Sequence, residues 1–439
     1  MQAKLMGANR YGWQFYMVVL LVICLIQFSG VWIYPAIKFG MAAGMTEDRP
    51  IHVIYQRMVW VLLIYAFIRV AQRGLGALAV SLRAFMPFLL MGLVAAVFGY
   101  SPIDSMRMLI MWCLMAAAAG ILGDNLPREK AERLLLWSGS VILVLCIVLA
   151  LAVPDVGTMA YGGDPVWRGL FTNKNEFGWF ASLMLLMAVM LRRPSGNRLS
   201  TVLALLALVC LLGSDSKGGL AAALAALAYI FLLRWLIPKV TPGFGIALVL
   251  VVMVVGLVVF TLGYVPLVEL LGRDATLTGR TTIWQTYFAS MSAHPWLGSG
   301  PGAYTVQSPL TAMLASRLES FGVIYTPHSS YLGVFGDTGL FGLVIFIGML
   351  IHLALVEPFY RTNRMYLLSG SLCFLIAASG VVETHNTYTP GPGWFLLILV
   401  RTLAIRERAN AAGGERRETA VPSGRSTGTY RYAQPLPRP

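Results

Sequence analysis

Apolar runs long enough to cross a membrane recur along almost the whole chain, and they limit its fold more than any other feature. A helix needs about 20 apolar residues to cross roughly 30 Å of hydrocarbon. Runs near this length occupy residues 14–34, 53–70, 77–99, 105–123, 133–153, 175–191, 199–213, 218–236, 242–264, 329–355, 365–382 and 392–406. They predict an all-α polytopic membrane protein with about twelve transmembrane helices.

The composition agrees with a membrane-spanning chain. Hydrophobic residues make up 58% of the 439 residues and charged residues 12%, whereas about a quarter of a soluble protein is charged. A net charge of +14 would indicate nucleic acid as the partner of a soluble protein. Here the basic residues gather in short connections and in the tail, as membrane topology requires. We therefore expect membrane lipids, and no nucleic acid, as partners.

The charges of the connections predict the orientation. If the N-terminus is cytoplasmic, the inner connections are those rich in Arg and Lys, at 69–83, 128–133, 192–198, 234–239 and 361–364. The outer connections are poorer in positive charge and include Asp104, Asp155 and Glu383. The positive-inside rule then places both termini in the cytoplasm. Residues 1–409 are predicted to form one transmembrane domain, and residues 410–439 a disordered basic cytoplasmic tail.

One long polar insert interrupts this pattern. Between residues 267 and 340 the chain is mostly polar, and we expect residues 265–328 to form an active-site loop on the outer side. Long loops in compact proteins are usually functional. The insert contains Arg273, Arg280, His294 and His328, together with a glycine-rich turn at 298–302 that is typical of a tight turn rather than of a nucleotide site.

Cations on the outer side are unexpected under the positive-inside rule, so each one calls for an explanation. The outer set is Arg168, Lys174, Lys217, Arg273, Arg280 and Arg317. Several cations at the level of the lipid headgroups indicate recognition of a lipid-linked phosphate or diphosphate. The structural alternatives are snorkelling and pairing with Asp215, Asp274 or Glu176. Next to Arg280, a helix that begins at Thr281 would add free backbone N–H groups to the anion site.

His328 lies where the insert returns to the membrane, in Thr326-Pro-His-Ser-Ser-Tyr-Leu332. A neutral imidazole can take a proton from a hydroxyl near pH 7. A lone histidine is more often structural, but the nearby cations favour a catalytic role. His52, His294 and His352 are weaker candidates, and His385 could line the same cavity.

The sequence lacks the patterns typical of metal and redox sites. The outer side contains no Asp-x-Asp pair and no His-x-x-x-His spacing, and the five cysteines are scattered through apolar runs. Acidic residues, which proton-coupled transporters usually require, are missing from the middle of the predicted spans. We expect a transferase that needs neither metal nor cofactor.

These residues resemble the bacterial O-antigen ligases of the WaaL type, within the O-antigen ligase/polymerase superfamily. The resemblance extends over most of the predicted topology. Its specific parts are Arg168-Gly-Leu-Phe-Thr-Asn-Lys-Asn175, Ser216-Lys-Gly218, Leu277-Thr-Gly-Arg280, Pro295-Trp-Leu-Gly-Ser-Gly-Pro-Gly302, His328-Ser-Ser-Tyr-Leu332 and Gly339-Leu-Phe-Gly342.

The resemblance implies a GT-C-like, metal-independent, inverting glycosyltransferase of the bacterial inner membrane, with its active site facing the periplasm. Its donor would be O-antigen linked to undecaprenyl diphosphate, and its acceptor a sugar hydroxyl of lipid A-core. His328 matches the family's proposed base and Arg280 its diphosphate-binding arginine. Lys217 stands where many members have arginine, which keeps the charge but loses bidentate binding. Arg273 and Arg168 would complete the diphosphate site.

Three alternatives remain open. An O-antigen polymerase would use the same donor with a second lipid-linked glycan as acceptor. Protein O-glycosyltransferases of the superfamily have a larger outer C-terminal part, so they fit less well. A lipid-linked glycan transporter would explain the spans and cations without chemistry, and would tolerate replacement of His328.

Overall fold

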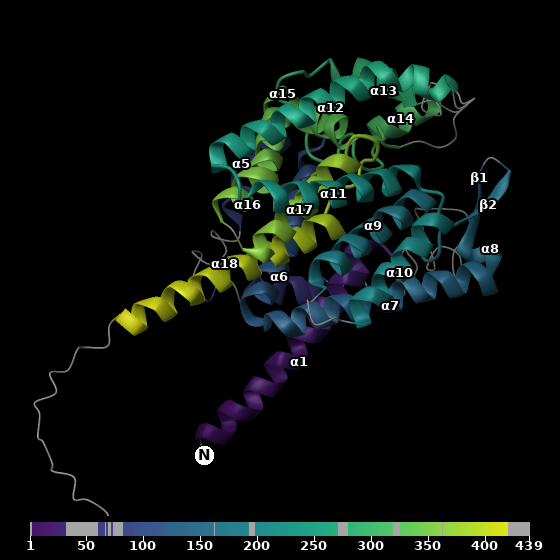
Figure 1. Ribbon diagram of the computed structural model, residues 1–439. Helices are drawn as coiled ribbons and strands as arrows, with labels where there is room; N and C mark the ends of the chain where they lie inside the picture. Colours follow the sequence, from purple (N-terminus) through teal and green to yellow (C-terminus); the bar gives the residue numbers. More distant parts are fainter. Residues whose placement is uncertain are drawn as a thin grey trace, which may run out of the picture.

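The computed structural model describes residues 2–31, 60–65, 67–68, 72, 82–161, 163–192, 198–270, 280–318, 325–361 and 363–419. These residues form a bundle of helices with one short β-hairpin (Figure 1). The elements are α1 Gln2–Ser29, α5 Met86–Phe98, α6 Pro102–Asn125, α7 Arg128–Ala152, α8 Pro154–Gly157, β1 Thr158–Tyr161, β2 Asp164–Trp167, α9 Lys174–Leu191, α10 Arg198–Gly213, α11 Lys217–Leu236, α12 Pro242–Leu270, α13 Arg280–Met291, α14 Pro309–Arg317, α15 Ser330–Ile351, the π-helix η2 His352–Val356, α16 Glu357–Tyr360, α17 Arg364–Ser379 and α18 Pro392–Thr419.

The predicted polytopic helical character is confirmed. Each predicted span except 53–70, most of which lies outside the described residues, coincides with a described helix. By length and composition, five described helices can cross a membrane, at Gly12–Ser29, Pro102–Asn125, Arg128–Ala152, Lys217–Leu236 and Ser330–Tyr360. Shorter apolar helices lie at Met86–Phe98, Arg198–Gly213, Pro242–Gly256 and Arg364–Ser379. The total of twelve spans stays a prediction.

Helix α9 lies at the centre of the bundle. From Phe177 to Leu191 every residue except Val189 is buried, and α9 packs against α7, α10, α11 and α17. Small residues allow α9 and α11 to approach each other closely. The hydroxyl of Ser182 on α9 donates to the backbone carbonyl of Gly219 on α11 at 2.8 Å. This close contact fixes the start of α11 next to the start of α9.

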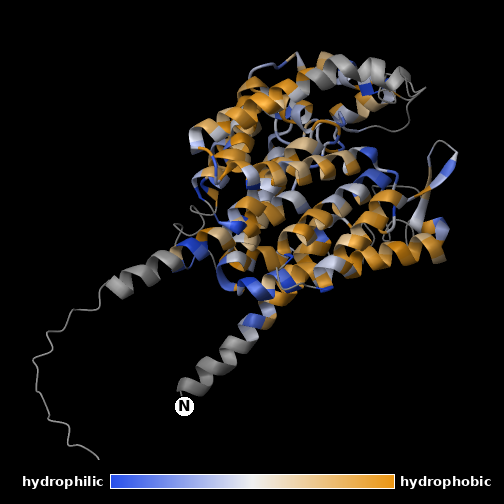
Figure 2. Cartoon of the chain, in the orientation of Figure 1, coloured by the Kyte–Doolittle hydropathy of each residue, from blue (hydrophilic) through white to orange (hydrophobic). Residues whose placement is uncertain are grey.

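Hydrophobic side chains cover the outside of the bundle. Figure 2 shows apolar colouring along α7 and α10 and hydrophilic residues near helix ends and connections. On α7 the exposed apolar residues include Val141, Val144, Val148 and Leu151. An exposed apolar surface of this extent is typical of helices that face lipid.

The connection between α12 and α15 is more ordered than predicted. Helix α12 continues to Leu270, and the connection contains α13 and α14. The role of residues 265–328 as an active-site loop stays a prediction. Helix α13 begins at Arg280, one residue before the expected start at Thr281. Ser308 caps α14 with a capping box that includes Thr311. Tyr287, Met291 and Leu314 form part of a small separate core under these helices.

A break in α15 holds the glycine-rich turn in place. Gly339 has φ +66° and ψ −167° inside α15, so the helix changes direction there. The freed backbone groups bond to the turn: Ser299 N–H donates to the carbonyl of Gly336 at 2.9 Å, and Leu340 N–H donates to that of Pro295 at 2.8 Å. The Asp337 carboxylate accepts from the N–H groups of Gly302 and Tyr304 and from the Thr305 hydroxyl, at 2.8–2.9 Å.

The C-terminal boundary differs from the prediction. Helix α18 continues to Thr419, past the expected start of the disordered tail at residue 410. Alanine, glutamate and arginine between 411 and 418 favour helix and outweigh the two glycines. The remaining tail, residues 420–439, lies outside the described residues. In Figure 1, α1 enters and α18 leaves the bundle on the same side, with the β1–β2 hairpin on the opposite side. Which side is the cytoplasm stays a prediction.

Candidate active site

Four helices begin beside residues 380–391, the connection between α17 and α18. The contacts to this connection come from Asn175 of α9, Gly218 of α11, Arg280 of α13 and Ser330 of α15. The first turn of a helix has backbone N–H groups without helical partners and the positive end of the helix dipole. Convergence of four such ends, with cationic side chains among them, favours binding of an anion such as phosphate.

Glu383 lies at the centre of this arrangement. Its Oε1 accepts from Asn175 Nδ2 at 2.9 Å and is 2.8 Å from Arg280 Nη2, and its Oε2 is 3.3 Å from His328 Nδ1. The Glu383 side chain is 11% exposed. Burial by itself raises the pKa of this carboxyl, but the hydrogen bond with His328 and the electrostatic effects of His385 and Arg280 outweigh it and hold the pKa at about 2. Glu383 is therefore a carboxylate at every physiological pH.

The backbone presents His328 in an unusual conformation. Its φ is +47°, in the left-handed region that is uncommon for residues other than glycine and that often marks functional sites. Immediately after it, Ser329 and Ser330 are fixed to the 380–391 connection by bonds to Thr384 and to the carbonyl of Glu383. If Nδ1 donates to Glu383, Nε2 keeps its lone pair and can accept a proton. The imidazole is 31% exposed, so a substrate can reach it.

Arg280 is held at two points. Its Nη1 donates to the carbonyl of Val382, and its Nη2 pairs with Glu383. A guanidinium has five N–H donors in a rigid plane, so three remain for a ligand. The side chain is 18% exposed, which places a partly desolvated positive charge at the edge of the site.

Lys217 lies beside the same connection. It is the first residue of α11, its side chain is exposed, and it has no ion pair with any other residue that the structure describes. The preceding Ser216 caps the helix by accepting from Gly219 N–H at 3.3 Å. A Cβ on the following Gly218 would lie 3.2 Å from Val382, so α11 presents its N-terminus next to Arg280.

The remaining predicted cations are placed differently. Arg168 Nε donates to the carbonyl of Val156 at 3.1 Å, which ties β2 to α8. Arg273 lies outside the described residues. Lys174 is buried, donates to the carbonyl of Asp215 at 3.2 Å, and stands 3.3 Å from the centre of the Tyr161 ring. For Lys174, the structural alternative of pairing with Asp215 therefore applies.

The sequence interpretation missed the importance of Glu383 and Asn175. Glu383 was recognised only as an acidic residue of an outer connection. The available signal was its position in Glu383-Thr-His-Asn386, where a carboxylate and a histidine occur together between two apolar runs. His385 itself is stacked on Trp179, with ring centres 5.6 Å apart. Burial lowers the pKa of His385.

An apolar groove lies beside His328, between α13 and the start of α15. Its volume is about 440 Å³, and it is lined by Trp284, Gln285, Phe288, Ser329, Tyr331, Leu332 and Val381. The groove is open along much of its length, and its walls are almost wholly hydrophobic. An acyl or isoprenoid chain fits such a surface.

No group of three or more His, Cys, Asp or Glu side chains that could hold a metal occurs in the part of the chain that the structure describes. Independence from metals stays a prediction.

Comparisons with known proteins bear on the region that contains Lys217 and His328. Residues 202–347 match a family model described as "O-Antigen ligase". The chain is also similar to the exopolysaccharide production protein ExoQ of Rhizobium meliloti, with 26% identity over 247 residues. That match covers 47% of this chain and 56% of ExoQ, so it spans about half of either protein. The resemblance found in the motifs is thereby confirmed, and the family match lies in residues 202–347.

Proposed function

We propose that this protein is an O-antigen ligase. It transfers O-antigen polysaccharide from undecaprenyl diphosphate to a sugar hydroxyl of lipid A-core, in a metal-independent reaction that inverts the anomeric carbon. The observation that carries the proposal is the Glu383 carboxylate, which holds His328 at 3.3 Å and Arg280 at 2.8 Å. One anion thus places a candidate base and a candidate anion ligand next to each other.

The donor diphosphate binds at the converging helix ends. Its negative charge grows as the glycosidic bond breaks, so fixed cations and N–H groups stabilise the transition state more than the ground state. Arg280 supplies its remaining donors, and Lys217 adds a mobile charge. Arg273 and Arg168 remain predicted ligands of the diphosphate.

The donor lipid lies in the apolar groove. Its wall residue Trp284 follows Arg280 by one turn of α13, and Ser329 follows His328 directly. A polyprenyl chain in the groove therefore has its diphosphate end near Arg280. This geometry ties the reaction to the membrane surface, where both lipid-linked substrates are dissolved.

The acceptor hydroxyl loses its proton to His328. Nε2 takes the proton as the oxygen attacks the anomeric carbon, and the Glu383 carboxylate stabilises the imidazolium that forms. The attack comes from the face opposite the leaving diphosphate, so one displacement inverts the configuration. Diphosphate is a good leaving group, and a second carboxylic acid to protonate it is unnecessary.

A glycan polymerase is the second candidate. The similarity to ExoQ, a protein named for exopolysaccharide production, favours it. The same donor site and base would then act on the sugar hydroxyl of another lipid-linked glycan. Only the acceptor distinguishes the two activities.

Complementation of a ligase-deficient bacterium tests the proposal. The strain must make the glycan and the core that this protein uses. Wild type, His328→Ala and Arg280→Ala are produced at matched membrane levels, with His294→Ala and Arg317→Ala as controls. Both control side chains are exposed, and neither is among the described side chains that contact Glu383. We expect wild type and controls to restore long-chain lipopolysaccharide, and the two site variants to accumulate lipid-linked glycan.

Other outcomes separate the alternatives. A wild-type protein that lengthens lipid-linked glycan without attaching it to lipid A-core is a polymerase. If His328→Ala supports normal lipopolysaccharide, His328 is not the base and a transport role becomes the better explanation.

A further inference from the structure

A second cavity lies beside the start of α6 and shares no lining residue with the apolar groove. It has a volume of about 330 Å³ and separates the start of α6 from the loop that follows the glycine-rich turn. The residues that line it are Tyr100, Ser101, Asp104, Ser105, Arg107, Met108, Met111, Pro301, Gly302, Ala303, Val306, Gln307, Ser308 and Pro309. This volume lies within the range of small-ligand sites.

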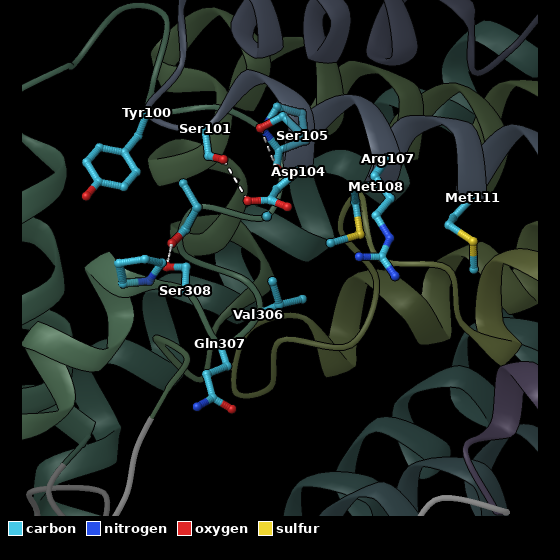
Figure 3. A pocket seen from close by; sticks show the side chains of 14 residues that line it. Tyr100, Ser101, Asp104, Ser105, Arg107, Met108, Met111, Val306, Gln307 and Ser308 are labelled. Atoms are coloured by element: carbon cyan, nitrogen blue, oxygen red, sulfur yellow. Dashed lines mark hydrogen bonds between the residues drawn. The ribbon is translucent and has the colours of Figure 1, made fainter. Parts of the chain in front are cut away.

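One face of α6 and one loop form the two walls. Figure 3 shows Asp104, Arg107 and Met108 on α6 facing the loop that carries Val306 and Gln307. Arg107 and Met108 follow Asp104 by three and four positions, which puts both of them on the side of the helix that carries Asp104. The cavity therefore combines an acid, a base, an amide and apolar methyl groups.

The walls are fixed to each other. Tyr100 N–H donates to the carbonyl of Ser299 at 2.7 Å, and Ser105 Oγ donates to that of Pro301 at 2.9 Å. On its other side the loop is bonded to the Asp337 carboxylate, which accepts from Gly302 N–H at 2.9 Å. A cavity with walls anchored at this many points is preformed, which lowers the entropic cost of binding.

Polar groups in the cavity are available to a ligand. Arg107 is exposed and has neither a hydrogen bond nor an ion pair with any other described residue. The exposed Asp104 accepts from the Ser101 hydroxyl at 2.6 Å and keeps further acceptor sites. Gln307 is exposed as well. Sugars have hydroxyl groups that donate and accept, and C–H faces that pack on apolar side chains, so this mixture of groups fits a saccharide.

The position of the cavity indicates which saccharide. Tyr331 and Leu332 of α15 line the apolar groove, whereas Gly333, Gly336 and Asp337 contact the loop of the cavity. Successive residues of an α-helix are 100° apart around its axis. The groove-lining residues and the residues that contact the cavity loop therefore lie roughly 150° apart around the axis of α15. From Ser330 to Asp337 the helix rises about 10 Å, so the residue of α15 that holds the cavity loop lies further along the helix than the residues next to His328.

We propose that this cavity is a binding subsite for a sugar of the acceptor glycan, held away from the reacting hydroxyl. The inference rests on the proposed transferase function, in which the acceptor approaches opposite the leaving diphosphate. The groove for the donor lipid and the saccharide cavity lie on opposite sides of α15, as that approach requires. Asp104 and Arg107 bind hydroxyl or acidic groups of the sugar, and Met108 packs against its ring.

Kinetics of the purified full-length protein in detergent test the subsite. The probes are a polyprenyl diphosphate glycan as donor and, as acceptor, lipid A-core isolated from a strain without O-antigen. For Asp104→Asn and Arg107→Met we expect the KM for lipid A-core to rise about tenfold, with kcat and the donor KM within about twofold of wild type. Both residues are exposed, so the variants should fold. Arg133→Met on α7, also exposed, is the matched control.

A binding measurement separates this inference from the proposed function. Core oligosaccharide released from the same lipid A-core is titrated into each protein and followed by saturation-transfer NMR, which needs no catalysis. Signals lost in Asp104→Asn and Arg107→Met but kept in Arg133→Met support the subsite even if no ligase activity is found. Equal binding by all variants overturns it. A changed donor KM with an unchanged acceptor KM also overturns it, because the cavity would then hold the donor glycan.

Discussion

A single carboxylate organises the candidate site at the scale of residues. Glu383 contacts His328, Arg280 and Asn175, which belong to different parts of the chain. It orients the imidazole, keeps Arg280 at the edge of the site, and remains charged because its pKa is about 2. Loss of this charge would release both partners while leaving their own chemistry intact. Glu383 therefore acts through His328 and Arg280.

Replacing the Glu383 carboxylate with an amide of similar size should change how His328 and Arg280 are positioned without preventing folding. For Glu383→Gln we expect glycan transfer to fall about a hundredfold, since an amide neither stabilises an imidazolium nor pairs with a guanidinium. Asp164→Asn in the exposed hairpin is the control for loss of one outer negative charge. Initial rates with purified proteins measure the effect. Near wild-type rates in Glu383→Gln would show that His328 and Arg280 need no carboxylate.

The low pKa of Glu383 also predicts how stability depends on pH. A carboxyl pKa of about 2 in the fold, against the ordinary glutamate pKa of 4.5, corresponds to about 3 kcal/mol. Because the folded pKa is the lower one, this stabilisation is fully present above pH 4.5 and is lost as the pH falls toward 2.

Thermal unfolding of the detergent-solubilised proteins tests whether this stabilisation is lost as the pH falls. At pH 7 wild type should have the higher Tm than Glu383→Gln, and the gap should narrow between pH 5 and pH 3. A gap that stays constant over this range would mean that the carboxyl does not titrate with a depressed pKa.

At the scale of elements, the break in α15 joins the two halves of the site. The segment that begins at Ser330 fixes His328 to the 380–391 connection, and the break at Gly339 opens backbone groups to the glycine-rich turn. The end of the glycine-rich turn and the loop that follows it form one wall of the saccharide cavity. A continuous helix would leave Ser299 and Leu340 without these backbone partners.

Two glycines of the same helix give a matched comparison. At Gly339, φ is +66° and a Cβ would overlap the carbonyl of Trp296, whereas a Cβ at Gly348 meets nothing within 4 Å. We expect Gly339→Ala to destabilise the protein by more than about 3 kcal/mol, through overlap and backbone strain together. Gly348→Ala should be neutral or slightly stabilising. Size-exclusion chromatography after heating measures the heat stability of both variants, as the fraction of protein that remains monodisperse. Equal heat stability of the two variants would remove the proposed role of the break.

At the scale of the whole molecule, the arrangement of helix ends predicts its orientation. The β1–β2 hairpin lies away from the side on which α1 enters and α18 leaves the bundle (Figure 1). Basic residues of the predicted inner connections indicate that the side with the free ends of α1 and α18 is cytoplasmic.

Single cysteines can test the orientation in intact cells. Four of the five native cysteines are buried and Cys113 is half-buried, so the background reactivity should be low. With a membrane-impermeant maleimide, we expect Asp164→Cys and Gln307→Cys to react in cells whose outer membrane is permeable. Glu129→Cys and Arg408→Cys should react only after the inner membrane is opened. The reverse pattern would invert the topology and place His328 on the cytoplasmic side.

The sequence was a good guide to helices and to the chemistry of single residues. Apolar runs predicted α6, α7 and α11 to within a few residues, because helix formation and lipid exposure depend on local pattern. His328, Arg280 and Lys217 stood out because a polar or basic group on the outer side needs a local reason. Where local pattern was weak, in the polar insert and the tail, the structure describes helix that the apolar runs did not indicate, in α14 and in α18 as far as Thr419.

Which residues meet was decided by the tertiary structure. Asn175 and Glu383 are 208 positions apart, and only the packing of α9, α11 and α17 around buried small residues brings them together. The break at Gly339 also depends on partners from a distant turn, since the hydrogen bonds that stabilise it come from residues 295–300. By itself the sequence determined a helical membrane protein with a basic outer site and a candidate base. The carboxylate that holds the base and the cavity beside it exist only because distant helix ends converge.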